Sequence, residues 1–329
     1  MSATGMSRFR AWWSQRPAAA GTAVMAAAIV SIGLHLIGHE TLSRIVLALA
    51  CAAWLALAAD FVVRLLRDRQ RWFAEAETPA GLTAVAATTV IGTRFSAAGW
   101  QTLAEALLAL AAVLWPGLLV DVVRHWKRRM AGAVFLVCVA TQGLAVLGAS
   151  LAAAESVAWL AHTALVLFWL GLVLYGVALG HFDVRQVVTG AGDHWVVGGA
   201  LAISTLAGSK LVAAGNGGLY LWNSDDRGVL RAVTEALLVL VMAWYVVLAV
   251  AEVVRPRLRY DVRRWATVFP LGMTAVAVLS VGTALGFSWL RTPGEVLVWI
   301  AVAGWLVVAV GAVRFYAGPE GQVTSTGPR

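Results

Sequence analysis

Apolar runs of membrane-crossing length follow one another along nearly the whole chain. Short clusters of charged, Gly or Asn residues separate them. Each run has roughly 17–25 residues, the apolar length that an α-helix needs to cross a bilayer. The pattern predicts ten membrane-spanning helices, at residues 17–38, 42–66, 79–95, 100–123, 131–151, 157–181, 194–213, 229–253, 265–288 and 294–316.

The composition places the chain in the class of integral membrane proteins. Of its 329 residues, 60% are hydrophobic and only 13% are charged, whereas soluble domains have about 25% charged residues. We therefore predict an all-α membrane domain over residues 17–317, with cytoplasmic tails at 1–16 and 318–329. A net charge of +8 would ordinarily suggest a nucleic-acid partner. Because the bases lie in short clusters between apolar runs, they indicate topology instead, and we expect no nucleic acid.

The distribution of Lys and Arg predicts the orientation in a cell (inner) membrane. Most bases lie in both tails and in the gaps that follow even-numbered spans, such as Arg124, Lys127, Arg128 and Arg129. By the positive-inside rule, these gaps and both termini are cytoplasmic. The opposite side has only Arg44, Arg94, Lys210, Arg227, Arg231 and Arg291.

A weak internal repeat indicates that the spans are arranged as helical hairpins. Even-numbered spans tend to end with an aromatic residue, then an acid, then a base. Four copies are Trp54, Asp60, Arg64; Trp115, Asp121, Arg124; Tyr175, Asp183, Arg185; and Trp244, Glu252, Arg255. The spacing predicts a two-helix unit used five times, although any hairpin with interfacial Trp and cytoplasmic Arg would look periodic.

The two members of each hairpin differ in composition. Odd-numbered spans are rich in small and hydroxyl residues, which allow close helix packing, whereas even-numbered spans carry Leu and Trp, which suit lipid. We predict that the odd helices form an inner ring around a pore and the even helices an outer ring. The alternative is a solid bundle in which the small residues only pack. The predicted pore-lining residues are Thr22, Ser31, Thr88, Thr89, Thr141, Gln142, Ser204, Thr205 and Thr274.

The charges of the odd-numbered spans favour an anion. These spans contain no Asp or Glu, and Arg94 and Lys210 lie near their predicted external ends. Carboxylate rings are typical of cation pathways, and Arg or Lys of anion pathways. We therefore predict that Arg94 and Lys210 attract anions.

Phe269 and Pro270 follow a basic, aromatic helix start at Arg264 and Trp265. Proline has no N–H to donate and interrupts the helix ladder, which predicts a special position in the pore wall. Phe269 beside it can act as a hydrophobic gate, so Phe269→Ala should raise anion flux strongly. The alternative is an ordinary packing aromatic next to a helix-start proline.

The order Trp265, Phe269, Pro270 resembles the ninth helix of the tellurite-resistance/C4-dicarboxylate transporter family, which includes the plant guard-cell slow anion channels. Residues 21–31, 79–92 and 193–208 are similar to its first, third and seventh helices. The resemblance implies five hairpins, a five-helix inner pore gated by Phe269, and homotrimers with one pore per subunit. It also implies passage of small anions such as tellurite, halide, nitrate, sulfite or C4-dicarboxylates. Unlike the family pattern, several inner spans here lack a mid-helix proline.

Other residues give no sign of catalysis. Cys51 and Cys138 lie inside apolar runs, and His35 and His39 have helical ligand spacing without further ligands. We expect no enzyme activity, cofactor or metal. Two transport hypotheses remain: passive anion conduction, and a proton-coupled carrier for a dicarboxylate such as malate, for which His35 and His162 are the candidate proton relays.

Overall fold

The computed structural model describes residues 21–67, 78–216, 224–255 and 261–317. Its regular elements are helices, and the one β-bridge among the described residues joins Met130 to Phe182. This confirms the prediction of an all-helical membrane protein. The tails predicted at 1–16 and 318–329 lie outside the described residues.

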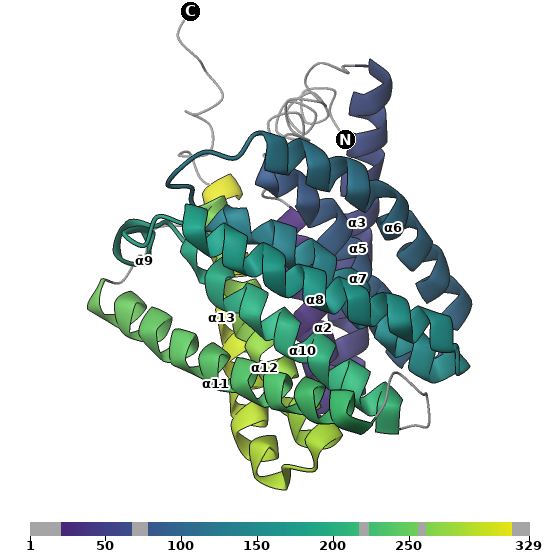
Figure 1. Ribbon diagram of the computed structural model, residues 1–329. Coiled ribbons are helices and arrows are strands. Elements are labelled where there is room, and N and C mark those ends of the chain that lie inside the picture. The colour runs from purple at the N-terminus through teal and green to yellow at the C-terminus, as the bar shows by residue number, and fades with distance from the viewer. Residues whose placement is uncertain (1–20, 68–77, 217–223, 256–260, 318–329) are drawn as a thin grey trace, which may run out of the picture.

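Each predicted span corresponds to a long helix whose ends differ by a few residues from those expected (Figure 1). Within the described ranges, eight of them, counted with the short turns that lead into them, are long and apolar enough to cross a membrane, and α2 is a shorter apolar helix. The number of actual crossings stays a prediction. The helices are α2 (Gly21–Leu36), α3 (Glu40–Arg67), α5 (Thr83–Ala97), α6 (Gln101–Arg124), α7 (Leu136–Glu155), α8 (Ala158–His181), α10 (Val196–Asn216), α11 (Ser224–Val254), α12 (Trp265–Leu285) and α13 (Arg291–Ala317).

Burial separates these helices into two sets. The apolar segments that contain α7, α10 and α12 are 94%, 83% and 67% buried, whereas those of α3, α6, α8, α11 and α13 are only 11–28% buried. Nearly all of α2 and α5 is also buried. We refer to α2, α5, α7, α10 and α12 as the inner helices and to the other five as the outer helices.

The inner helices contact one another in a closed cycle. In the order α2, α5, α7, α10, α12, each packs against the next, and α12 packs against α2. Every outer helix packs on the inner helix that precedes it in the chain, so consecutive helices form hairpins. In Figure 1, α11 runs along the outside of the bundle.

The inner helices begin at the same end of the bundle. Short 3₁₀ turns at Pro79–Leu82, Gly132–Phe135, Asp193–Trp195 and Val262–Arg264 lead into α5, α7, α10 and α12. The first three turns contact each other in sequence. Asp261 caps the last one by accepting hydrogen bonds from Arg263. Partial burial opposes its ionisation, but these bonds hold the pKa of Asp261 below its usual value. The starts of α2 and α12 lie at this end as well, because a Cβ at Gly21 would collide with Thr83 and one at Gly192 would lie 2.6 Å from the Arg263 carbonyl oxygen. The five inner helices are therefore parallel.

Two glycines allow close approach between inner helices. A Cβ at Gly143 of α7 would collide with the Thr89 hydroxyl of α5, and one at Gly272 of α12 would lie 2.8 Å from Ile29 Cγ2 of α2. Small residues in the odd-numbered spans thus bring inner helices together, as the composition predicts.

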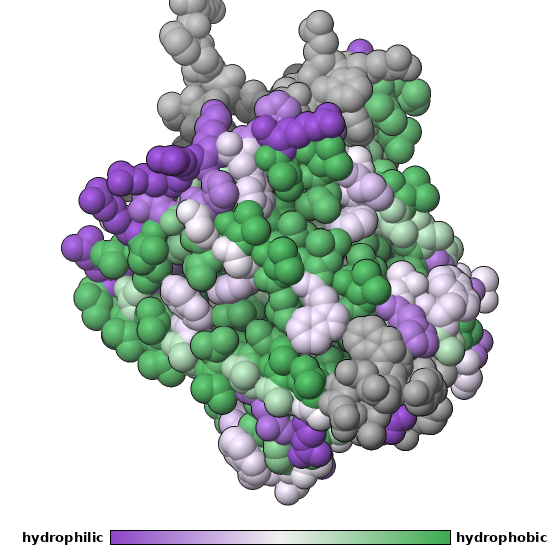
Figure 2. Space-filling view, viewed as in Figure 1, coloured by the Kyte–Doolittle hydropathy of each residue, from purple (hydrophilic) through white to green (hydrophobic). Residues whose placement is uncertain are grey.

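The outside of the bundle is apolar across its middle and polar toward its ends (Figure 2). Outward aliphatic side chains such as Val113 and Val253 are 79% and 81% exposed. Trp100, Trp159 and Trp289 lie exposed at the starts of outer helices, where membrane proteins place interfacial aromatics. This surface is that of a protein surrounded by lipid.

Candidate functional site

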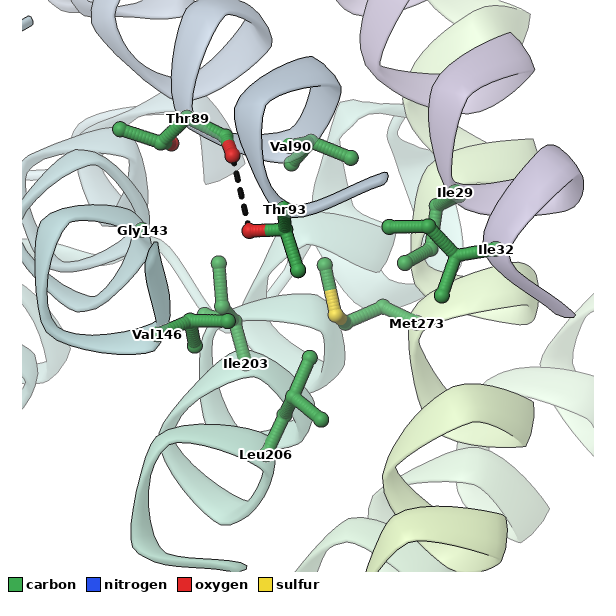
Figure 3. A pocket seen from close by; sticks show the side chains of 10 residues that line it. All are labelled: Ile29, Ile32, Thr89, Val90, Thr93, Gly143, Val146, Ile203, Leu206 and Met273. Atoms are coloured by element: carbon green, nitrogen blue, oxygen red, sulfur yellow. Dashed lines mark hydrogen bonds between the residues drawn. The ribbon is translucent and has the colours of Figure 1, made fainter. Parts of the chain in front are cut away.

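A small cavity lies where the five inner helices meet (Figure 3). It has about 10 Å³ of space open to the centre of a water molecule, which is room for roughly one water. Because every inner helix contributes to its wall, the cavity marks the axis of the helix cycle. Its lining residues are Ile29 and Ile32 of α2, Thr89, Val90 and Thr93 of α5, Gly143 and Val146 of α7, Ile203 and Leu206 of α10, and Met273 of α12.

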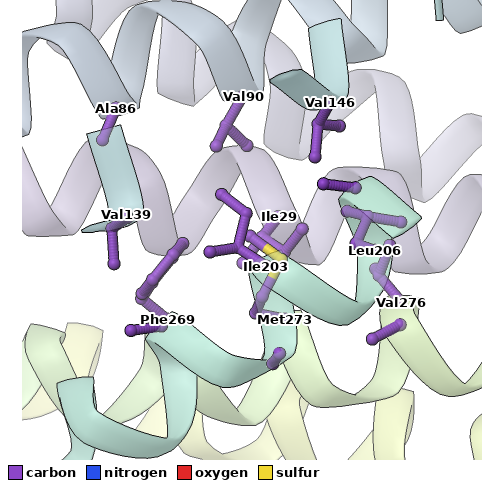
Figure 4. Packing of buried hydrophobic residues seen from close by; sticks show 14 of the residues in the cluster. Ile29, Ala86, Val90, Val139, Val146, Ile203, Leu206, Phe269, Met273 and Val276 are labelled. Atoms are coloured by element: carbon purple, nitrogen blue, oxygen red, sulfur yellow. The ribbon is translucent and has the colours of Figure 1, made fainter. Parts of the chain in front are cut away.

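The axial side chains occur at intervals of three, four or seven residues, which keeps them on one face of each helix. Phe269, Met273 and Val276 of α12 show this spacing. Together with residues of the other helices they form three successive layers (Figure 4). The Phe269 layer contains Ala86, Val139 and Phe269; the Met273 layer contains Ile29, Val90, Ile203 and Met273; the Val276 layer contains Val146, Leu206 and Val276.

Phe269 and Pro270 lie in the second turn of α12, and Phe269 is only 1% exposed. Since Pro270 has no N–H, the Ala266 carbonyl lacks its usual helical partner. Gly199 of α10 makes room for the pair, because a Cβ there would lie 2.8 Å from Pro270 Cγ and 3.4 Å from Phe269 Cε1. The structure therefore places Phe269 among the axial side chains near the start of α12, with Pro270 packed against α10.

Four predicted lining residues bond to outer helices instead of facing the axis. Trp54 and Trp115 donate their indole N–H groups to the hydroxyls of Thr88 and Thr141, both at 2.9 Å. Gln142 donates to the carbonyl of Phe168 at 3.0 Å, and Ser31 to that of Ser43 at 2.8 Å. Each of these side chains thus donates a hydrogen bond to, or accepts one from, an outer helix at the contact between helices. Their pore-lining role stays a prediction.

The other five predicted lining residues differ in position. Thr89 lines the axial cavity. Ser204 and Thr205 donate to carbonyls of their own helix at 2.7 and 2.9 Å, and they are not part of this cavity wall. Thr22 and Thr274 are buried and also lie outside it.

Sequence reasoning missed most of the axial lining because it searched for polar residues. The aliphatic side chains of the Met273 and Val276 layers form the wall instead. The available signal was the occurrence of large residues at helical spacing within otherwise small-residue spans, as with Ile29 and Ile32, or Ile203 and Leu206.

Arg94 is not available to an anion at the axis. Its side chain is fully buried, and it donates to the Glu40 carboxylate at 2.9 and 3.0 Å and to Ser43 Oγ at 3.0 Å, both on α3. Glu40 also pairs with His35 at 2.6 Å and with Arg44 at 2.8 Å. The charge of Arg94 is therefore compensated, and its side chain points toward an outer helix.

Lys210 differs from Arg94 both in the direction that its helix face points and in its lack of a compensating charge among the described residues. It lies four residues beyond Leu206 and seven beyond Ile203, hence on the same face of α10 as these axial residues. Its side chain is half-buried and forms no ion pair within the described part of the chain. The same register places Thr93, Ser150 and Ser280 toward this end of the axis.

Neither cysteine takes part in a disulfide. Cys51 is half-buried on α3, and Cys138 is fully buried with Sγ 3.7 Å from Ser204 Oγ. Over the described ranges, no group of three or more His, Cys, Asp or Glu side chains is arranged to hold a metal ion.

Comparison with known proteins now identifies the family. A family model described as "Voltage-dependent anion channel" (SLAC1) matches residues 16–313. The chain belongs to the voltage-dependent anion channel family. Membership confirms the resemblance to the tellurite-resistance/dicarboxylate transporter type, which is a family of channels and transporters.

The chain is also similar to two uncharacterized membrane proteins of Mycobacterium tuberculosis, from strains CDC 1551 / Oshkosh and H37Rv. Each is 29% identical over 135 residues, a stretch that covers 39% of this chain and 66% of the relative. The match thus spans just under two thirds of the length of these relatives.

Proposed function

We propose that this voltage-dependent anion channel family member conducts small anions along the axis of its five inner helices, with Phe269 closing the route. The observation that carries the proposal is the axial cavity, whose wall comes from all five inner helices. The anion class includes halide, nitrate, sulfite, tellurite and C4-dicarboxylates. No feature of the axial wall selects among them.

The charge distribution along the axis supports an anion. None of the residues that line the axial cavity is acidic, and Lys210, which forms no ion pair among the described residues, lies on the same helix face one turn beyond it. A cation at the entrance raises the local concentration of anions without binding them so deeply that release becomes slow.

The orientation completes the proposal. The inner helices begin next to the basic clusters around Arg124 and Arg264, so this end, with Phe269, faces the cytoplasm of a cell (inner) membrane. Lys210 then lies at the external entrance. We also propose a homotrimer with one conduit per subunit, for which the exposed aliphatic surface of the outer helices offers contact area.

The test is anion flux in proteoliposomes that contain the purified protein and its axial variants. We expect a current whose reversal potential follows the anion gradient and does not change with a pH gradient. Obligatory proton movement would contradict this and support the dicarboxylate carrier. The positions of the two candidate proton relays favour passive conduction over proton coupling. His35 pairs with Glu40, and His162 lies exposed on outer helix α8 with its ring nitrogen bonded to the Ala158 carbonyl.

A further inference from the structure

The axis is closed beyond Phe269 as well as at Phe269. The Met273 layer and the Val276 layer follow it along α12 (Figure 4). From Phe269 to Val276 the chain advances by seven residues, or roughly 10 Å at 1.5 Å per residue. Met273, Ile203 and Val276 are each 1% exposed, so apolar side chains occupy this length apart from the small axial cavity.

The wall of this stretch offers an anion almost no hydrogen-bond donor. Its hydroxyl groups belong to Thr89 and Thr93. Thr89 already donates to the carbonyl of Ala86 at 2.9 Å, and Thr93 donates to the carbonyl of Thr89 at 2.9 Å (Figure 3). The cavity beside them has room for roughly one water. An ion that passed Phe269 would therefore lose its hydration without replacement, which makes a dry aliphatic constriction a barrier.

Met273 is the side chain in this layer that can move most easily. Ile29, Val90 and Ile203 are β-branched and have restricted χ1 angles, whereas methionine is unbranched and has three rotatable side-chain bonds. Met273 also lies one helical turn from Phe269 on the same face of α12. Movement of α12 or of these two side chains would change both layers together.

We propose that Met273, packed against Ile29, Val90 and Ile203, forms a second, aliphatic gate in series with Phe269. The inference rests on the proposed conduction along the axis and adds a residue that controls it. On this view Phe269→Ala alone leaves the axis closed at Met273, instead of giving the strong rise in flux that a single Phe gate predicts.

The experiment compares nitrate and chloride efflux from proteoliposomes with the unmodified protein, Phe269→Ala, Met273→Ala and the double variant. Removing one of two barriers in series should change efflux by less than about threefold, while removing both should raise it by about tenfold or more. If Phe269→Ala alone equals the double variant, the second gate is refuted while axial conduction stands. If the folded double variant remains closed, the second gate and the axial route are both refuted.

Matched controls separate gating from general loosening of the bundle. Phe168→Ala removes an equally buried phenylalanine of outer helix α8, and Met242→Ala a methionine of outer helix α11. Neither should open the route, whether alone or combined with an axial variant. In the Phe269→Ala background, Met273→Leu should keep the route closed because it retains the bulk of the layer. Ile203→Ala supplies a second way to open the same layer, and elution volume and thermal unfolding in detergent verify folding of each variant.

Discussion

The indole N–H of Trp54 donates to the hydroxyl of Thr88 at 2.9 Å, and so links outer helix α3 of the first hairpin to inner helix α5 of the second. Trp115 of α6 repeats the relationship with Thr141 of α7, also at 2.9 Å. Both tryptophans are the aromatic members of the sequence repeat. In these two copies, the repeat encodes a hydrogen bond from one hairpin to the next.

Breaking this bond should lower stability without changing anion selectivity. Trp54→Phe and Thr88→Val each remove one partner of the same hydrogen bond, and we expect each to cost about 1 kcal/mol of unfolding free energy. The double variant should cost less than the sum, because the second change has no bond left to remove. Thermal unfolding in detergent measures the cycle. Additive effects, or altered anion selectivity in the Thr88→Val protein, would contradict this placement of Thr88.

Glu40→Gln should destabilise the protein and leave anion flux unchanged. The substitution removes the counter-charge of the fully buried Arg94, and breaking a buried pair from one side costs roughly 3–5 kcal/mol. We expect a loss below this range, because Glu40 is partly exposed. The comparison is with Glu235→Gln, which breaks the exposed ion pair between Arg231 and Glu235 on α11. An equal effect of the two substitutions on melting temperature would argue against a structural role for the Glu40–Arg94 pair.

Lys210→Gln should reduce anion flux, by about three- to tenfold at low ionic strength, because the ammonium concentrates anions at the entrance. The reduction should shrink as salt is added, since counterions screen the charge. Arg291→Gln is the matched control: Arg291 belongs to the same predicted side of the membrane but is exposed and paired with Glu295. Flux through Lys210→Gln that equals that of the unmodified protein at low salt would rule out this role.

Gly272→Ala should destabilise the contact between α12 and α2. The added methyl group would lie 2.8 Å from Ile29 Cγ2, and such overpacking costs about 1–3 kcal/mol. Gly176→Ala on α8 is the control, because nothing lies within 4 Å of the new Cβ. Its stability should stay the same or rise slightly, since alanine has the higher helix propensity. A similar loss in both variants would contradict the close approach of α12 and α2 as the cause, because nothing crowds the new methyl group at Gly176.

The fold could be predicted from sequence because membrane helices carry strong, local signals. The length of apolar runs fixed the ten segments, and the contrast between small residues such as Gly143 and bulky ones such as Trp115 separated buried helices from exposed ones. Both signals have a physical cause: lipid requires a continuous apolar surface, and close contacts between helices require small side chains.

The candidate site was predicted less completely. Phe269 and Lys210 are candidates because proline and isolated charge are conspicuous within an apolar span, and their roles stay predictions. The contacts of Thr88 and Thr141 with outer helices could not be predicted, because composition does not show which face of a helix looks inward. The ion pair of Arg94 could not be predicted, because its partner Glu40 lies 54 residues away and only the folded chain reveals that the two charges meet.

The parallel arrangement of the inner helices has an electrical consequence. Peptide dipoles in α2, α5, α7, α10 and α12 all point the same way, so partial positive charge accumulates where these helices begin and partial negative charge where they end. Lys210 offsets only part of the negative end. An ion therefore meets a sloping potential that differs between its two directions of travel, and a conduit built in this way should rectify.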